Sequence, residues 1–254
     1  METTWPGDTL ARMVKDVDLP TLQRLLEIQG HDSAIARLTH RKSTLPEARR
    51  LSEVRGQLEE LAADIEIAQK QALEIGREQD RLEGEIQLLE QKVTREEQRL
   101  FSGGVSNPKE LSSLQAEVAM LKKKRSGLED GLLEVMVQKE DATGTEERLR
   151  SESADATAEA ESLTKTVATL SSEIDVELES HVEARAGLLP PVPEDLLKLY
   201  EQIRAAKGGV GVAALRGGTC EGCHTQLPAQ EVERLKAAGG LQRCDNCRRI
   251  LVVV

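Results

Sequence analysis

A repeating pattern of apolar residues constrains this chain more than any other feature of its sequence. From residue 58 to residue 100, apolar side chains recur at alternating steps of three and four, and only Gln79 and Glu96 interrupt this seam. A second seam runs from 111 to 181 in one register. Its polar positions are Arg125, Lys139, Glu146, Ser153, Glu177 and His181. An average spacing of 3.5 residues keeps one stripe facing a partner helix, so both segments are predicted to be coiled-coil helices.

Prolines and capping residues predict where these helices begin and end. No proline occurs between 109 and 189, and such a stretch permits a long helix because an internal proline removes a hydrogen bond. Asn107 followed by Pro108 is a helix-start pattern, and the preceding glycines favour a reversal. We therefore predict a mainly α fold, with a long antiparallel coiled-coil hairpin over 21–188 that reverses near 101–107.

The other prolines and capping residues predict how the rest of the chain is divided into segments. The segment Thr44-Leu-Pro46-Glu47 resembles a capping box, which predicts a break in the first arm near 43–46. The other expected segments are an N-terminal tail (1–20), a proline-rich connector with a short helix (189–207) and a small β-rich module (208–254).

The cysteines of the C-terminal module have the spacing C-x2-C-x20-C-x2-C. Two intervening residues let a tight turn aim both sulfurs of a pair at one ion, and four thiolates complete a tetrahedral zinc site with no open position. Two disulfides are the alternative, which the reducing cytosol disfavours. The pattern predicts a C4 zinc ribbon holding one structural Zn²⁺ through Cys220, Cys223, Cys244 and Cys247.

Composition excludes several classes of protein. The chain has only three aromatic residues (Trp5, Phe101 and Tyr200), too few for a large globular core. Its histidines and hydroxyl residues form no recognisable catalytic constellation, so neither enzymatic activity nor a small-molecule substrate is expected. No apolar run is long enough to span a membrane and the N-terminus lacks a signal-peptide core, so a cytoplasmic protein without membrane contact is expected.

The charge distribution leaves nucleic-acid binding open. Residues 198–254 have a net charge of +4, whereas residues 1–197 have a net charge of −15. A basic run near the tip either contacts phosphate or is a solvated face that pairs with Glu83 and Glu85 of the other arm. The ribbon has no aromatic side chain to stack on bases. The candidate nucleic-acid contacts are Lys122, Lys123, Lys124, Arg216, Lys236, Arg243, Arg248 and Arg249.

Specific motifs accompany the hairpin and the cysteines. They are Asn107–Glu117 after the tip, Leu199–Arg204, Gly211-Val-Ala213, and Arg248–Leu251 after the second cysteine pair. With these motifs the chain resembles the bacterial C4-type zinc-ribbon coiled-coil family. The resemblance implies zinc binding without enzymatic activity, and an adaptor or chaperone-like role.

Three functions follow from these observations. The favoured one is an adaptor that presents its arm and ribbon to a protein partner, with Phe101 either a candidate anchor for that partner or a staple closing the tip. The second is a nucleic-acid- or ribosome-associated protein. The third is a structural coiled coil that forms homodimers.

Overall fold

The computed structural model describes residues 17–103 and 107–254. Within these described residues, four helices come first and a small C-terminal region of strands follows, which confirms the predicted mainly α class with a long helical hairpin and a zinc ribbon. Residues 1–16 of the expected tail, including Trp5, and residues 104–106 of the expected reversal lie outside the described part. The helices are α2 (Leu19–Ser43), α3 (Pro46–Phe101), α4 (Pro108–Leu188) and α5 (Glu194–Ala206).

Contacts group the chain into two compact units. We call Arg50–Thr164 the arm unit, and we call the residues up to Arg49 together with Lys165–Val254 the ribbon unit. The four segments expected from the sequence remain a prediction, because this grouping follows contacts rather than chain order.

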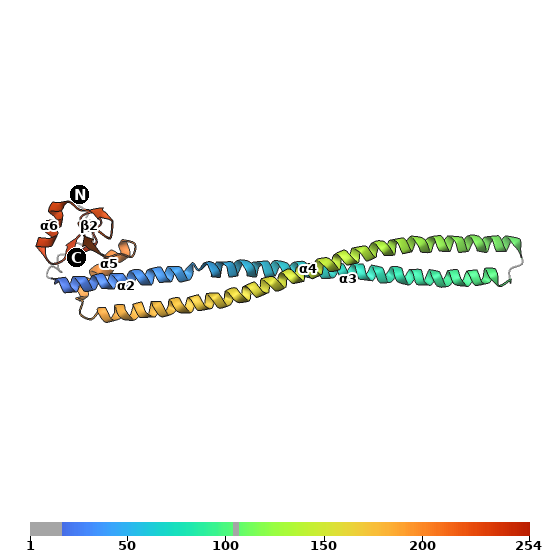
Figure 1. Cartoon of the computed structure of the whole chain (residues 1–254), viewed down its shortest axis with the longest axis horizontal. Coiled ribbons are helices and arrows are strands. Elements are labelled where there is room, and N and C mark those ends of the chain that lie inside the picture. The colour runs from blue at the N-terminus through green and yellow to red at the C-terminus, as the bar shows by residue number, and fades with distance from the viewer. Residues whose placement is uncertain (1–16, 104–106) are drawn as a thin grey trace. The chain divides into compact units, whose positions relative to one another are not determined.

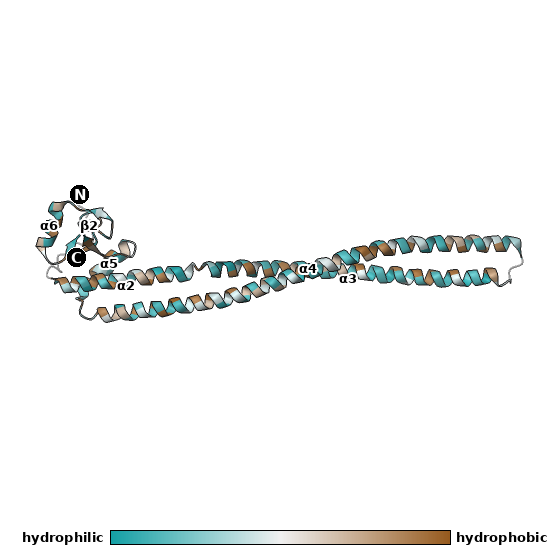
Figure 2. Cartoon of the chain, in the orientation of Figure 1, coloured by the Kyte–Doolittle hydropathy of each residue, from teal (hydrophilic) through white to brown (hydrophobic). Residues whose placement is uncertain are grey.

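In the arm unit, α3 and α4 run antiparallel and side by side (Figure 1). Apolar residues recur along both helices among polar ones (Figure 2). The predicted seams are confirmed, because the fully buried side chains of the arm unit fall on them or on their extension toward the break. These side chains, each less than 9% exposed, are Leu51, Val54, Ala68, Leu82, Val93, Glu96, Leu114, Val118, Leu121 and Leu149.

Two polar positions of these seams meet each other. Lys139 Nζ donates a 2.9 Å hydrogen bond to Gln79 Oε1 across the hairpin. A polar pair on an apolar seam favours one register, because sliding the helices would leave both groups unpaired.

Short capping contacts fix the helix starts. Asp18 Oδ1 accepts a 3.1 Å hydrogen bond from the Thr21 amide, so α2 begins at Leu19, two residues before the expected start. Asn107 Oδ1 accepts a 3.0 Å bond from the Lys109 amide, which confirms the predicted cap of α4. Each cap satisfies an amide that has no partner within its own helix.

The interruption between α2 and α3 has a different origin from the expected capping box. The Thr44 hydroxyl donates to the His40 carbonyl at 2.8 Å, so this side chain ends α2 instead of capping α3. Pro46 begins α3, where its missing N–H has no cost. Between them, Leu45 is buried and packs with Leu38 and Ile174.

The C-terminal region is a five-stranded sheet with one helix, α6 (Ala229–Ala238). The strand order is β3-β2-β1-β5-β4. The central pair β1·β5 is parallel, with Val212 opposite Ile250, and the other pairs are antiparallel. The strands are β1 (Val212–Arg216), β2 (Thr219–Cys220), β3 (Thr225–Gln226), β4 (Gln242–Arg243) and β5 (Ile250–Val253).

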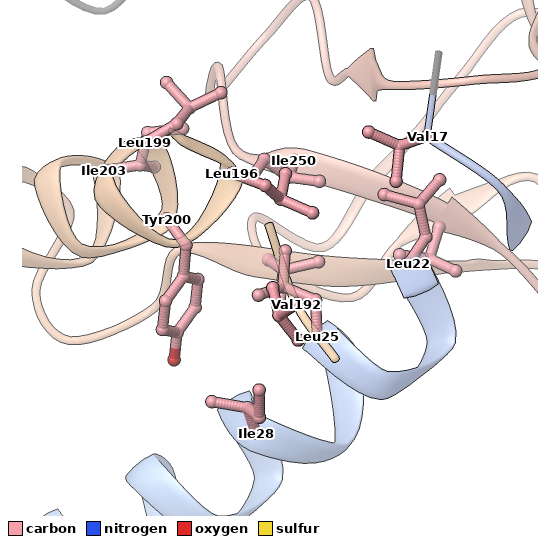
Figure 3. Close-up of a cluster of buried hydrophobic side chains, with 12 residues drawn as sticks. Val17, Leu22, Leu25, Ile28, Val192, Leu196, Leu199, Tyr200, Ile203 and Ile250 are labelled. Carbon is pink, nitrogen blue, oxygen red and sulfur yellow. The ribbon is translucent and has the colours of Figure 1, made fainter. Parts of the chain in front are cut away.

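This sheet separates two hydrophobic cores of the ribbon unit. Successive strand residues point to opposite faces, so Ile250 packs on α2 and α5 while Leu251 packs on the cysteine side. In Figure 3, Tyr200 and its α5 neighbours lie beside Leu25 and Ile28 of α2. The ribbon therefore completes its core with helices that come from distant parts of the sequence.

Candidate metal centre

The four cysteines converge at one end of the sheet. Their sulfur atoms all lie within 4.8 Å of one another, and Cys220–Cys247 and Cys223–Cys244 are each separated by 3.9 Å. A zinc ion with four Zn–S bonds of about 2.3 Å places its sulfurs about 3.8 Å apart. The geometry fits zinc, and the four thiolates hold one structural Zn²⁺ without leaving a coordination position for substrate.

Two matching turns aim these sulfurs. The His224 amide donates to the Cys220 carbonyl, and the Arg248 amide donates to the Cys244 carbonyl, both at 2.8 Å. His224 and Arg248 have φ values of 59° and 65°, in the left-handed region that non-glycine residues rarely adopt. The sequence analysis did not predict that His224 and Arg248 close these turns, although each residue directly follows a C-x2-C pair.

The surroundings of the thiols differ. Burial raises the pKa of Cys220 to about 12 and also raises the pKa of Cys244. Burial acts in the same direction on Cys223, but hydrogen bonds from Thr225 and Asn246 outweigh it and lower the pKa to about 6. Asn246 Nδ2 lies 3.6 Å from Cys223 Sγ. Burial thus opposes ionisation of two ligands, and a bound cation supplies the charge that stabilises their thiolates.

Arg249, a candidate phosphate contact from the sequence, points inward. Its guanidinium donates to the carbonyls of Val210 (2.9 Å), Gly222 (2.7 Å) and Lys207 (2.7 Å). Gly222 lies between the first two cysteines, and a Cβ there would come within 2.8 Å of Arg249 Cδ. Arg249 therefore joins the first cysteine turn to the end of α5, and each of its three guanidinium nitrogens donates to a backbone carbonyl.

The other basic candidates of the ribbon unit lie at its surface. The structure brings Arg243 and Arg248 together, whereas Lys122–Lys124 belong to the arm unit. Acidic or carbonyl groups engage three of the ribbon candidates, in the pairs Arg216–Glu221 (3.6 Å), Lys236–Glu233 (3.0 Å) and Arg243–Arg248 carbonyl (2.9 Å).

The basic run near the tip is exposed. Lys122 pairs with Glu97 at 2.6 Å, so the expected partners Glu83 and Glu85 were wrong. Glu83 instead accepts from Gln79, and Glu85 pairs with Arg81, each on its own helix. The expectation assumed a reversal centred near residue 104, whereas Lys122 meets Glu97 and Lys139 meets Gln79, so the partners on α3 lie about ten residues closer to the tip than that centre places them. Separately, the candidate anchor Phe101 is 80% exposed at the end of α3.

Neither the long helices nor the shorter ones suggest a membrane span. Within residues 17–103 and 107–254, no helix combines the length and the apolar character that crossing a bilayer requires.

Comparison with family models identifies both parts of the chain. The CT398-like coiled coil hairpin domain matches residues 28–208, and the C4-type zinc ribbon domain matches residues 219–251. An uncharacterized protein of Mycobacterium tuberculosis is 31% identical over 239 residues, covering 90% of this chain and 93% of that protein. An uncharacterized protein of Mycobacterium leprae is 28% identical over 210 residues, covering 79% and 86%.

Two solved structures share the fold. A Mycobacterium smegmatis protein has a TM-score of 0.77 at 24% identity, over 93% of this chain and 99% of that one. CT398 from Chlamydia trachomatis has a TM-score of 0.66 at 20% identity, over 92% and 98%. With both domain models matched in the same order as the hairpin and the cysteine cluster, the chain belongs to the CT398-like coiled-coil hairpin family and carries a C4-type zinc ribbon.

Proposed function

We propose that this zinc-binding coiled-coil protein is a non-enzymatic, cytoplasmic adaptor or chaperone-like protein that presents its arm and ribbon to a protein partner. The observation that carries this proposal is an exposed apolar patch on α4. Leu133, Met136 and Val137 are 62%, 47% and 59% exposed. Because they are three and four residues apart, they share one face of the helix.

The patch is separate from the packing of the hairpin. Its residues lie off the predicted seam, whose neighbouring positions Leu132 and Val135 face inward and are partly buried. Contiguous exposed apolar side chains on a charged helix are typical of surfaces that contact other proteins. Exposed Phe101 supports the anchor interpretation over the staple, because a staple would bury its ring.

Protein is favoured over nucleic acid as the partner. The Arg249 donors are bound to carbonyls, and Lys122 is paired with Glu97. The ribbon sequence also offers no aromatic ring for base stacking. Bound nucleic acid that is released by salt would instead support the second function.

The test compares capture of proteins by the tagged full chain and by a patch variant. Leu133→Glu combined with Val137→Glu should remove the partner, because two carboxylates cannot be buried against an apolar surface without a large cost. Gln138→Glu is the matched control, since it adds a charge to the same helix away from the patch and should retain the partner. Quantitative mass spectrometry of the captured proteins gives the result.

Two outcomes would contradict the proposal. Equal capture by the wild-type chain and the patch variant would exclude this surface as the docking site. If the purified chain is dimeric, the patch variant is monomeric and no other protein depends on the patch, the homodimer function is correct instead.

A further inference from the structure

Acidic side chains border the exposed apolar patch of α4 at both of its ends. Asp130 precedes Leu133 by three residues, and Glu140 and Asp141 follow Val137 by three and four residues. Residues three or four apart are neighbours on a helix surface, so these acids adjoin the patch. We call Asp130, Glu140 and Asp141 the rim acids.

The rim acids are available to a partner. All three are exposed, and no side chain of residues 17–103 or 107–254 forms an ion pair with them. The nearby cations are engaged elsewhere. Arg125 Nε lies 3.1 Å from Glu129, and Lys139 Nζ donates to Gln79 of α3. The surface is therefore apolar at its centre and carries negative charge at each end.

This charge selects a cationic partner. Residues 126–164 of α4 include eleven acids and three bases, a net charge of −8. Such a segment attracts basic surfaces and repels acidic ones, including nucleic acid.

A second copy of this chain would meet the same repulsion. In a parallel contact between two patches, each rim acid would lie beside its own counterpart. In an antiparallel contact centred on Val135, Asp130 of one copy would lie beside Glu140 of the other, because each is five residues from that centre. Acids oppose acids in both arrangements.

The shape of this surface favours a helix as its partner. The patch residues lie on one face of a single helix, and a second helix laid along it can fit its side chains between them. Asp130 and Glu140 are ten residues apart, which is about 15 Å along the axis. Three turns of a partner helix would reach both ends.

Resting on the docking role proposed above for this patch, we propose that its partner is a basic amphipathic helix. Apolar residues of that helix, at steps of three and four, cover Leu133, Met136 and Val137. Its lysines or arginines pair with the rim acids at both ends. The apolar contact supplies most of the affinity, and the charges select the partner and fix its position.

The test measures the binding of labelled synthetic peptides to the zinc-saturated full chain by fluorescence anisotropy. The probe is a helical peptide of about 18 residues, or five turns, with leucines at steps of three and four flanked by lysines. We expect it to bind at least ~tenfold more tightly than the same peptide with glutamates replacing the lysines. A lysine peptide of the same composition, with its leucines spread around the helix, should also bind at least ~tenfold more weakly.

Two variants separate the charges from the apolar patch. Asp130→Asn combined with Glu140→Gln and Asp141→Asn should weaken binding of the lysine peptide at least ~fivefold, and should not weaken binding of the glutamate peptide. Leu133→Gln combined with Val137→Gln removes apolar area without changing the charge, and should weaken binding of the lysine peptide at least ~tenfold.

A matched control removes three exposed acids elsewhere on α4, with Asp155→Asn, Glu161→Gln and Glu173→Gln. Asp155, the nearest of them, is 18 residues beyond Val137, about 27 Å along the axis and outside the Debye length, so binding should be retained. In NMR spectra the methyl signal of Met136 should shift on binding, whereas that of Met120, which is 64% exposed on the same helix, should not. Circular dichroism checks the helicity of each variant.

Several outcomes would overturn the basic partner. If both peptides bind equally and both are lost in the Leu133→Gln, Val137→Gln variant, the patch docks apolar helices regardless of charge. The proposal also fails if the lysine peptide does not bind, if it leaves the Met136 signal in place, or if the rim and control variants weaken it equally. The docking role itself is judged separately, by the capture experiment with Leu133→Glu and Val137→Glu.

Discussion

At the scale of single residues, a few buried polar side chains hold the ribbon unit together. Asp32 is 3% exposed and accepts hydrogen bonds from Tyr200 Oη at 2.6 Å and from Arg185 Nε at 2.8 Å. Gln29 Oε1 accepts a 2.6 Å bond from the Gly211 amide. Gly211 has no space for a side chain, since a Cβ would lie 2.7 Å from the Tyr200 ring. These contacts connect α2, α5 and the start of β1.

Tyr200 gives a prediction about alkaline pH. Burial, followed by its bond to Asp32, raises the pKa of Tyr200 above the ordinary value of 10.0. Its contribution to stability should therefore be complete below about pH 10 and decrease at higher pH, because the unfolded chain releases the phenolic proton first. Tyr200→Phe should remove this decrease and lower the unfolding free energy at neutral pH by about 1.5–3 kcal/mol, the value of a hydrogen bond to a charged group.

The effect is measured by urea unfolding of the zinc-saturated wild type and Tyr200→Phe from about pH 8 to about pH 11. Other titrating groups change the unfolding free energy of both proteins equally, so the difference between the two free energies reports Tyr200 alone. Parallel curves for wild type and Tyr200→Phe above pH 10 would rule out the assigned role of the phenol.

At the scale of secondary structure, a residue's place on or off the seam decides how much its side chain contributes to stability. Ile174 and Val176 are two residues apart on α4, but Ile174 is 1% exposed and Val176 is 65% exposed. Ile174 packs with Leu38 and with Leu45 of the break between α2 and α3. Ile174 and Val176 thus provide a buried test position and an exposed control position within one turn of the same helix.

We expect Ile174→Ala to lower the unfolding free energy by about 2–5 kcal/mol, because it leaves a cavity against Leu45. Val176→Ala should change it by less than about 0.5 kcal/mol. Thermal and urea unfolding of the two variants test this. Similar losses for both would contradict the packing role assigned to Ile174, because alanine is the better helix former at both positions.

At the scale of the whole molecule, the packing of the sheet predicts that zinc stabilises more than the ribbon. The same sheet that carries the cysteines supplies Val212, Ile250 and Val252 to the core shared with α2 and α5. Arg249 ties the first cysteine turn to the end of α5. Losing the metal should therefore loosen helices that contribute no ligand.

Hydrogen exchange should reveal this coupling. In Cys220→Ser, or after chelation of zinc, we expect amide protection to fall in the sheet, in α5 and in the first turns of α2. Helical amides of the arm unit, Arg50–Thr164, should keep their protection, and zinc should restore the rest in the chelated wild type. If α5 stays protected while the sheet exchanges, the ribbon is energetically independent of the helices.

Much of this fold could be predicted because its signals are local. The steps of three and four placed Leu82, Val118 and Ile174 on buried seams, and Asn107 predicted the start of α4. The C-x2-C turns predicted the zinc ligands, since each turn is set by consecutive residues. Thr44 was misassigned because a hydroxyl between two helices can bond to either one.

The sequence by itself determined the helix pattern, the polar seam positions and the four ligands of the metal, because periodicity and short spacing act within a few turns of chain. Only the tertiary structure decided that Arg249 points inward, that Tyr200 meets Asp32 and that His31 meets His181. Each of these contacts joins groups far apart in sequence, up to 168 residues for Tyr200 and Asp32. No local pattern encodes such a partner, because it depends on how separately formed helices and strands pack to bury their apolar faces.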